Sequence, residues 1–260
     1  MRNFKLTLCY DGTRYRGWQR QGNTDDTLQK KTEDLLSRLL EQPVEVHASG
    51  RTDAGVHARM QVCSFHADTA ITCEEMLRKI RSFLPEDVGA TQLTEAEPRF
   101  HARLNCTEKT YLYRVWTSDV PNVFERKYLY FFPGMLNIAA MRQAADLLTG
   151  RHDFTAFTTD RQVRTGKKSG IREIRQIRFE QVTDSDGNAL GLNTFYTGDG
   201  FLYNMVRILT GTLLEVGQGK RGADSMERLL SSRDREQAGF TAPAKGLTLW
   251  EVKYGPGNEK

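Results

Sequence analysis

The segment from Gly50 to Ala58 (GRTDAGVHA) groups a cation, a hydroxyl, a carboxylate and an imidazole around two glycines. This composition cannot bury a hydrophobic face, so it predicts a loop whose backbone shape matters, and such loops often carry function. Asp53 follows Arg51 by two residues and Thr52 by one, so a guanidinium and a hydroxyl can hold its carboxylate ionised at a defined angle. This is the setting of a nucleophile or a general base.

A purely structural role also fits this spacing. Glycines at both ends of a tight turn would let Asp53 accept backbone hydrogen bonds, as in an Asx-turn. Short motifs carry a large risk of false positives. The complete nine-residue string is much rarer by chance, which favours the catalytic interpretation.

The sequence contains no second set of residues for covalent catalysis. It has no Gly-x-Ser-x-Gly elbow, no P-loop and no zinc-deaminase signature. The five histidines are scattered singly, so a metal site is poorly supported.

Lysine and arginine are concentrated in two stretches. One of them carries Trp18 together with Arg14, Arg16 and Arg20. The other comprises Arg161, Arg164, Lys167, Lys168, Arg172, Arg175 and Arg178. A run of charges is usually only a solvated surface. Two basic runs, one with an aromatic ring that could stack on a base, suit contacts with a folded RNA.

Length and composition predict a globular chain. The 260 residues allow one large domain or two small ones. A hydrophobic fraction of 38% with 27% charged residues lacks the signature of disorder. The net charge is only +4, so binding to nucleic acid must depend on local clusters of Lys and Arg.

The cysteines and the N-terminus bear on the compartment. Cys9, Cys63, Cys73 and Cys106 show no Cys-x-x-Cys spacing and are predicted to act as small buried hydrophobic residues. The N-terminus lacks the apolar core of a signal peptide, and no apolar run approaches the length of a membrane span. We therefore expect a reducing cytoplasm and no membrane partner.

The elements that must position the loop follow from periodicity and capping signals. In the first half, strands are predicted at 4–10, 44–47, 61–65 and 88–93, and helices at the capping boxes Asp26–Gln29 and Thr72–Glu75. In the second half, strands are predicted at 107–117, 171–181, 192–197 and 247–252, and helices at 137–148, 203–216 and 224–230. The first strand alternates apolar and polar residues and is expected to be half-buried.

The first half thus has the order β-α-β-β-α-β of a ferredoxin-like, split-βαβ unit, and the second half repeats this order without repeating the sequence. We predict an α+β fold of two pseudo-symmetric ferredoxin-like halves, with a mixed or antiparallel central sheet and a cleft between the halves. Residues 1–105 would carry the loop, and residues 106–260 would contact the substrate ring and RNA.

The loop Gly50–Ala58 resembles the catalytic loop of the TruA family of tRNA pseudouridine synthases, whose Asp is the essential nucleophile. Further motifs agree in the family's order: Tyr10–Thr13 followed by Gly17–Gln21, Arg99–Arg103, Lys109–Tyr111, and Met205–Arg207 leading to Gly211. The resemblance covers nearly the whole chain. It implies conversion of uridine to pseudouridine at positions 38, 39 and 40 of tRNA, in the anticodon stem-loop, by chemistry that needs no metal or redox cofactor.

The resemblance also implies roles for single residues. Asp53 would attack the flipped nucleotide, and Arg51 would pair with Asp53 and fill the vacated stack, an ordinary surface salt bridge being the alternative for Arg51. Tyr111 would lie against the target ring, either as a stacking platform or as the base that removes a proton. Arg207 would pair with the Asp53 carboxylate or a nearby phosphate. The predicted tRNA contacts are Arg20, Arg164, Lys167 and Lys168.

Two departures from the family pattern bear on the target. Arg81 stands where the family usually has Asn, and Lys30-Lys31-Thr32 replaces helix residues that are more often small or apolar. They are consistent with a paralogue that modifies another RNA. A catalytically silent protein that binds or folds RNA is the alternative from a different class, and the intact set of Arg51, Asp53 and Tyr111 weighs against it.

A homodimer is predicted from size as well as from resemblance. A chain of this length has a radius of gyration of roughly 18 Å, which is short compared with a folded tRNA. The family is homodimeric, and closed two-fold dimers are the commonest soluble assembly. We expect tRNA to be the nucleic-acid partner, with no DNA partner.

Overall fold

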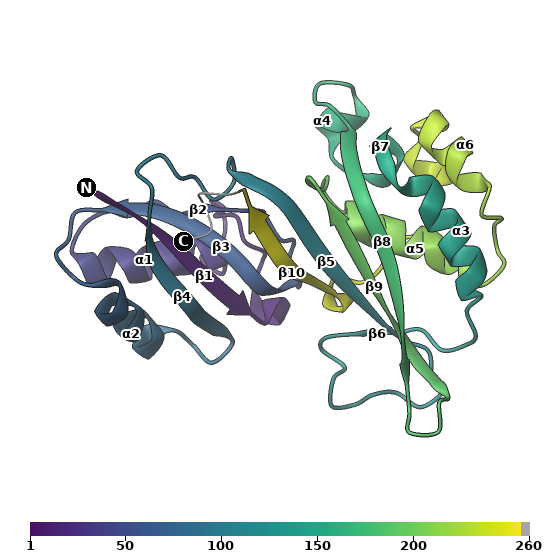
Figure 1. Cartoon of the computed structure of the whole chain (residues 1–260), viewed down its shortest axis with the longest axis horizontal. Coiled ribbons are helices and arrows are strands. Elements are labelled where there is room, and N and C mark those ends of the chain that lie inside the picture. The colour runs from purple at the N-terminus through teal and green to yellow at the C-terminus, as the bar shows by residue number, and fades with distance from the viewer. Residues whose placement is uncertain (256–260) are drawn as a thin grey trace. The chain divides into compact units, whose positions relative to one another are not determined.

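The computed structural model describes residues 1–255, which form two compact units. Unit 1 comprises Met1–Lys109 together with the chain from Thr248 onward, and unit 2 comprises Thr110–Leu247. Most of the last strand therefore belongs to the unit that the N-terminal half of the sequence forms. Each unit combines a β-sheet with helices (Figure 1), so the predicted α+β class is confirmed. The pseudo-symmetry of the two halves stays a prediction.

In unit 1, the strands lie in the order β4, β1, β3, β10, and β2 pairs with β3. Strand β1 is antiparallel to both neighbours, whereas β10 is parallel to β3, so the sheet is mixed. The elements are β1 (Arg2–Tyr10), α1 (Leu28–Leu40), β2 (His47–Ala48), β3 (His57–Ala67), α2 (Cys73–Phe83), β4 (Val88–Ala96) and β10 (Leu247–Tyr254). The observed β-α-β-β-α-β order of the first six elements is the predicted one.

Strand β1 is buried on both faces, so the prediction of a half-buried strand was wrong. Phe4, Leu6 and Leu8 are fully buried, and the polar residues between them are buried as well. The segment after β4 covers the second face, because the Asn3 side chain donates hydrogen bonds to the Glu97 and Phe100 carbonyls, each at 2.8 Å. An alternating sequence can therefore sit in the centre of a fold when polar side chains bind a crossing segment.

Of the strand predicted at 44–47, only His47 lies in a strand, which is β2 (His47–Ala48). Side chains of α1 accept hydrogen bonds from the backbone N–H groups that a longer strand would use for pairing. Ser37 Oγ accepts from Val44 N–H at 3.0 Å, and Glu33 Oε1 accepts from Val46 N–H at 3.1 Å. Two residues of β3, Cys63 and Ser64, pair with β2. Residues 44–46 are thus fixed by a helix, and His47 and Ala48 are fixed by the sheet.

The capping signals had mixed outcomes. Thr72 Oγ1 accepts from Glu75 N–H at 3.2 Å at the start of α2, which confirms that capping site. The capping box predicted at Asp26–Gln29 was wrong: α1 begins at Leu28, and the Asp26 carboxylate lies 3.2 Å from Lys31 Nζ. The Gln29 side chain instead accepts the Arg20 backbone N–H at 3.0 Å, which attaches the preceding loop to the helix.

In unit 2, the strands lie in the order β5, β9, β8, β7, with β6 parallel to β5. Helices α3, α5 and α6 gather on one side of these strands (Figure 1), and α5 is buried along most of its length. The elements are β5 (Cys106–Trp116), β6 (Tyr130–Phe131), α3 (Ile138–Leu148), β7 (Gly150–Asp153), α4 (Arg161–Arg164), β8 (Ile171–Thr183), β9 (Ala189–Gly198), α5 (Met205–Gly217) and α6 (Ser225–Ser232). The sequence does not predict β6, β7 or α4, because two to four residues are too few for a periodic pattern.

Among residues 1–255, no helix has the length and apolar character needed to cross a bilayer. The four cysteines are all free thiols in this part of the chain, and Cys63 is buried, which raises the pKa of its thiol. Cys9, Cys73 and Cys106 are only partly buried, so the prediction of burial holds for one of the four.

Candidate active site

The loop that carries Asp53 joins β2 to β3 in unit 1. Val56 N–H donates to the Asp53 carbonyl at 3.1 Å, and Gly55 adopts a φ of 78°, so the chain turns sharply just after Asp53. Along the loop, the Arg51 side chain is exposed, Thr52 is buried and Asp53 is half-buried. The backbone therefore presents the guanidinium and the carboxylate outward and turns the intervening hydroxyl inward.

The inward direction of Thr52 alters the predicted site. Its hydroxyl was expected to hold the Asp53 carboxylate, but Thr52 Oγ1 lies 2.7 Å from the Tyr10 hydroxyl in the interior of unit 1. Thr52 therefore attaches the loop to the end of β1.

A segment following β1 holds the loop from the other side. The Trp18 backbone N–H donates to the Thr52 carbonyl at 2.9 Å, and the Gly55 backbone N–H donates to the Tyr15 carbonyl at 3.4 Å. Gly17 between them has a φ of 96°, and a Cβ at this position would lie 2.8 Å from the Thr52 carbonyl oxygen. Only glycine combines this backbone angle with so close an approach.

His57 has a structural position rather than a catalytic one. Its side chain is buried, and its Nδ1 accepts the Gly12 backbone N–H at 3.0 Å. The same nitrogen lies 3.2 Å from Asp11 Oδ1. The imidazole of the motif thus connects the end of the loop to the Asp11–Gly12 turn.

Trp18 does not offer a surface for stacking on RNA, so this interpretation was wrong. Its side chain is 1% exposed and its ring packs against Tyr10 with centroids 6.2 Å apart. Arg20, by contrast, is exposed, and its guanidinium lies 3.6 Å from Glu33 Oε2. The loop after β1 therefore presents a cation but buries its tryptophan, because Trp18 packs beneath the Asp53 loop.

In unit 2, Tyr111 lies on β5 with 8% of its surface exposed. Its ring meets Phe201 edge to face, with centroids 5.3 Å apart. Tyr113, two residues further along the same face, is fully buried and donates its hydroxyl to the Pro243 carbonyl at 2.7 Å. The aromatic side chains on this face of β5 are thus mostly core, and Tyr111 is the more exposed of the two.

Arg207 lies in the first turn of α5 and is partly exposed. Its Nε donates to the Ala242 carbonyl at 2.7 Å and its Nη1 donates to Asn204 Oδ1 at 2.8 Å. These bonds fix the plane of the guanidinium. The start of a helix favours anions, so a fixed cation there is suited to a carboxylate or a phosphate.

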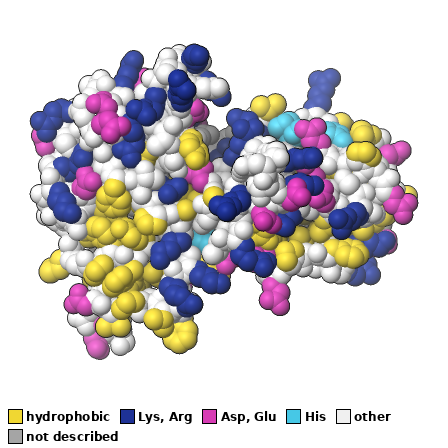
Figure 2. Space-filling view, turned by 180° about the vertical axis from the view of Figure 1, so that it is seen from behind, with side chains coloured by type: hydrophobic (Ala, Val, Ile, Leu, Met, Phe, Trp, Pro, Cys, Tyr) yellow, Lys and Arg dark blue, Asp and Glu magenta, His cyan; other side chains and the backbone are white. Residues whose placement is uncertain are grey.

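The second basic stretch forms α4 and the loop that follows it. Asp160 caps α4 by accepting Gln162 N–H at 2.9 Å, and Lys168 N–H donates to the Gln162 carbonyl at 3.0 Å. The side chains of Arg164, Lys167 and Lys168 are exposed. Figure 2 shows Lys and Arg side chains at the end of unit 2 where Figure 1 places α4. The turn thus gathers several cations into one short, exposed segment.

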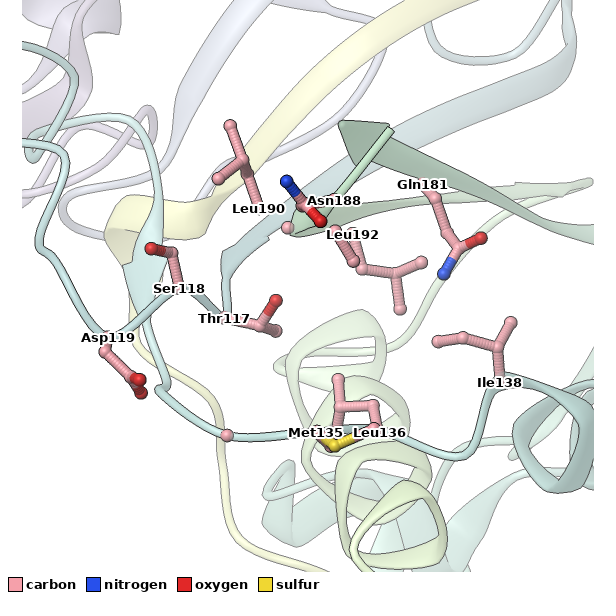
Figure 3. Close-up of a pocket in the computed structure, with 13 residues that line it drawn as sticks. Thr117, Ser118, Asp119, Met135, Leu136, Ile138, Gln181, Asn188, Leu190 and Leu192 are labelled. Carbon is pink, nitrogen blue, oxygen red and sulfur yellow. The ribbon is translucent and has the colours of Figure 1, made fainter. Parts of the chain in front are cut away.

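A pocket of about 420 Å³ in unit 2 contains none of the predicted site residues among those described (Figure 3). Leu192, Leu136 and Ile138 are among its apolar lining residues, and Asp119 lies at its edge. Among the described residues, its lining includes no Lys or Arg, which a site for nucleic acid would need. This pocket does not support RNA chemistry.

The predicted residues thus divide between the units. Unit 1 carries Asp53, Arg51 and Arg20, whereas unit 2 carries Tyr111, Arg207, Arg164, Lys167 and Lys168. A role for the buried polar residues beneath the loop, Tyr10, Ser49 and Gln61, was not predicted from the sequence. A glutamine inside an apolar strand is the signal that could have indicated them.

Comparisons with known proteins identify the family of the chain. The family model described as tRNA pseudouridine synthase matches residues 8–105 and 144–255, which include every predicted site residue except Tyr111. "tRNA pseudouridine synthase A" of Bacillus sp. (strain KSM-64) is 42% identical over 98% of this chain and all of the relative. A protein of the same name with the suffix 2, from Bacillus cereus (strain ZK / E33L), is 39% identical with the same coverage. "tRNA pseudouridine synthase A 1" of Clostridium tetani is 42% identical, again over 98% of this chain.

Proposed function

This chain belongs to the tRNA pseudouridine synthase family, which isomerises uridine in tRNA, and we propose that its targets are positions 38, 39 and 40 of the anticodon stem-loop and its nucleophile is Asp53. The observation that carries the assignment of Asp53 is the loop geometry. Backbone hydrogen bonds from Trp18 and Val56 fix the chain on both sides of Asp53 while its carboxylate stays partly exposed. A nucleophile needs such a fixed and accessible position.

The reaction rearranges a nucleotide without adding or removing atoms. The Asp53 carboxylate attacks the flipped nucleotide, the glycosidic bond breaks, and the uracil ring rotates to bond through carbon 5. The bond between the Asp53 carboxylate and the nucleotide breaks again, a base removes the proton from carbon 5, and N1 takes up a proton. We assign to Arg51, exposed two residues before Asp53, the filling of the stack that the flipped base leaves.

Tyr111 and Arg207 supply the contacts from unit 2. The Tyr111 ring is held edge to face by Phe201. Tyr111 contacts the target ring, either as a stacking platform or through its hydroxyl as the base. Arg207 is held by Ala242 and Asn204 and binds a carboxylate or an RNA phosphate.

If the Tyr111 hydroxyl acts as the base in proton removal, Tyr111→Phe should lower turnover about tenfold or more while tRNA affinity changes little. Tyr111→Ala should lower both. Single-turnover rates and tRNA Kd would be measured for each variant. Tyr113→Phe is the matched control, since it removes a buried hydroxyl from the same strand. Near-normal turnover in Tyr111→Phe, with loss only in Tyr111→Ala, would assign a stacking role to the ring instead.

The exposed cations of the α4 segment and Arg20 bind the tRNA backbone. Such contacts position a folded RNA and make its binding depend on salt. A reducing cytoplasm, where tRNA is modified and free thiols such as these four persist, is the proposed compartment.

The test of function is to incubate the protein with tRNA that contains only unmodified uridine and to map pseudouridine. Conversion at positions 38, 39 and 40 supports the proposal. Conversion at other sites would indicate a paralogue with another target. Binding without conversion at any position would favour a silent RNA-binding protein.

We further propose a homodimer in which the α4 cations of one subunit serve the Asp53 of the other. Mixing Asp53→Asn with a variant carrying Arg164→Gln, Lys167→Gln and Lys168→Gln should then restore about a quarter of wild-type activity. With random exchange, half of the dimers are mixed and one of their two sites is intact. A monomer in sedimentation, or no rescue despite demonstrated exchange, would refute the shared site.

A further inference from the structure

A buried chain of hydrogen bonds lies directly behind the Asp53 loop in unit 1. At its centre is Gln61 of β3, which is fully buried. Ser49 Oγ donates to Gln61 Oε1 at 2.8 Å, and Gln61 Nε2 donates to the Gly50 carbonyl at 2.9 Å and to the Tyr10 hydroxyl at 3.4 Å. The Tyr10 hydroxyl lies 2.7 Å from Thr52 Oγ1. These hydrogen bonds thus contact the loop at two residues, Gly50 and Thr52.

The donor and acceptor capacities of these groups determine the direction of each hydrogen bond. The Gly50 carbonyl can only accept, so it must face the amide nitrogen of Gln61, and the amide oxygen is left to accept from Ser49. The Tyr10 oxygen accepts from Gln61 and can donate its proton to Thr52. Buried groups satisfied in this way hold a single arrangement, because breaking one bond leaves its partner unpaired in the interior.

The two contact points lie on either side of Arg51 and immediately before Asp53. Rotation of the Thr52 backbone would carry Asp53 with it, and the Tyr10 hydroxyl opposes that rotation through the Thr52 side chain. The Trp18 amide holds the Thr52 carbonyl at the same residue. Thr52 is therefore held through both its side chain and its backbone.

We propose that Tyr10 and Gln61 are positioning residues for the reaction, which hold the Asp53 carboxylate in its attacking position through Thr52 and Gly50. Tyr10 is 5% exposed and Gln61 is fully buried, so they act through the loop and do not touch the RNA. The proposal rests on the assignment of Asp53 as the nucleophile. Displacement of a reacting group by about 1 Å can cost roughly a hundredfold in rate.

The test compares Tyr10→Phe with Tyr196→Phe. Tyr196 of unit 2 is fully buried, and its hydroxyl lies 2.9 Å from Thr210 Oγ1, so the control removes the same kind of tyrosine–threonine bond outside the Asp53 loop. Both variants should lower Tm by a few degrees. Tyr10→Phe should lower the single-turnover rate at saturating enzyme about tenfold or more and leave tRNA Kd within about twofold. Tyr196→Phe should leave the rate unchanged.

Thr52→Val removes the other half of the same bond and gives a second measurement. If the bond acts as proposed, the double variant Tyr10→Phe/Thr52→Val is no slower than the slower single variant, whereas independent effects would multiply. A wild-type rate for Tyr10→Phe, or multiplied losses in the double variant, would overturn the proposal. A wrong assignment of Asp53 as the nucleophile would be seen separately, because Asp53→Asn would then stay active or the wild-type protein would form no pseudouridine.

Discussion

Asp53→Asn is expected to abolish pseudouridine formation while leaving the fold and tRNA affinity intact. The substitution removes the nucleophilic charge and nearly preserves the shape of the side chain, and asparagine retains the backbone bond in which the residue 53 carbonyl accepts Val56 N–H. Loss of a nucleophile lowers the rate by at least about 1,000-fold. Single-turnover assays with excess enzyme, together with tRNA binding and thermal unfolding, would measure the three quantities.

Asp34→Asn is the control for the change of charge, because Asp34 lies on α1 and pairs with Lys30 at 2.9 Å. It should keep wild-type turnover. Pseudouridine formation by Asp53→Asn at a rate comparable to that of the wild type would show that another group is the nucleophile.

Gly17→Ala should have the second largest effect. The added Cβ would lie 2.8 Å from the Thr52 carbonyl oxygen and 3.2 Å from both the Asp53 carbonyl carbon and the Ala54 nitrogen. These are backbone atoms of the catalytic loop, so the loop itself must move. We expect the single-turnover rate to fall roughly a hundredfold, with little change in tRNA Kd.

Gly134→Ala separates this clash from backbone strain. Gly134 has a φ of 116°, and apart from its chain neighbours no described atom lies within 4 Å of a Cβ built there. Both variants bear the strain of a positive φ, about 1–2 kcal/mol, and should lose similar stability from that cause. Only Gly17→Ala should lose turnover. Equal rates in the two variants would contradict a positioning role for the Gly17 contact.

Family membership and the α+β class could be predicted from the sequence, because both depend on local patterns. The string from Gly50 to Ala58 identified the family, and the comparisons confirm it. The start of α2 was predicted because Thr72 and Glu75 are three residues apart, and the Thr72 hydroxyl accepts the Glu75 backbone N–H as a local cap. The assignments of Asp53, Arg51, Tyr111 and Arg207 stay predictions until the variants are measured.

Other features were decided by residues far apart in the chain. The segment at 44–47 is mostly not a strand because the Glu33 and Ser37 side chains accept hydrogen bonds from its amide groups. Trp18 is buried because its ring packs against Tyr10. In each case a contact with residues elsewhere in the sequence overrode the local pattern.

The sequence by itself determined which carboxylate is the candidate nucleophile, since residue types and their spacing define the motif. Only the tertiary structure decided how that carboxylate is held. Tyr10 and Thr52 are 42 positions apart, and Tyr10 and Gln61 are 51 apart. Their hydroxyl and amide groups meet because β1 and β3 pair side by side, and no periodicity within either strand records that contact.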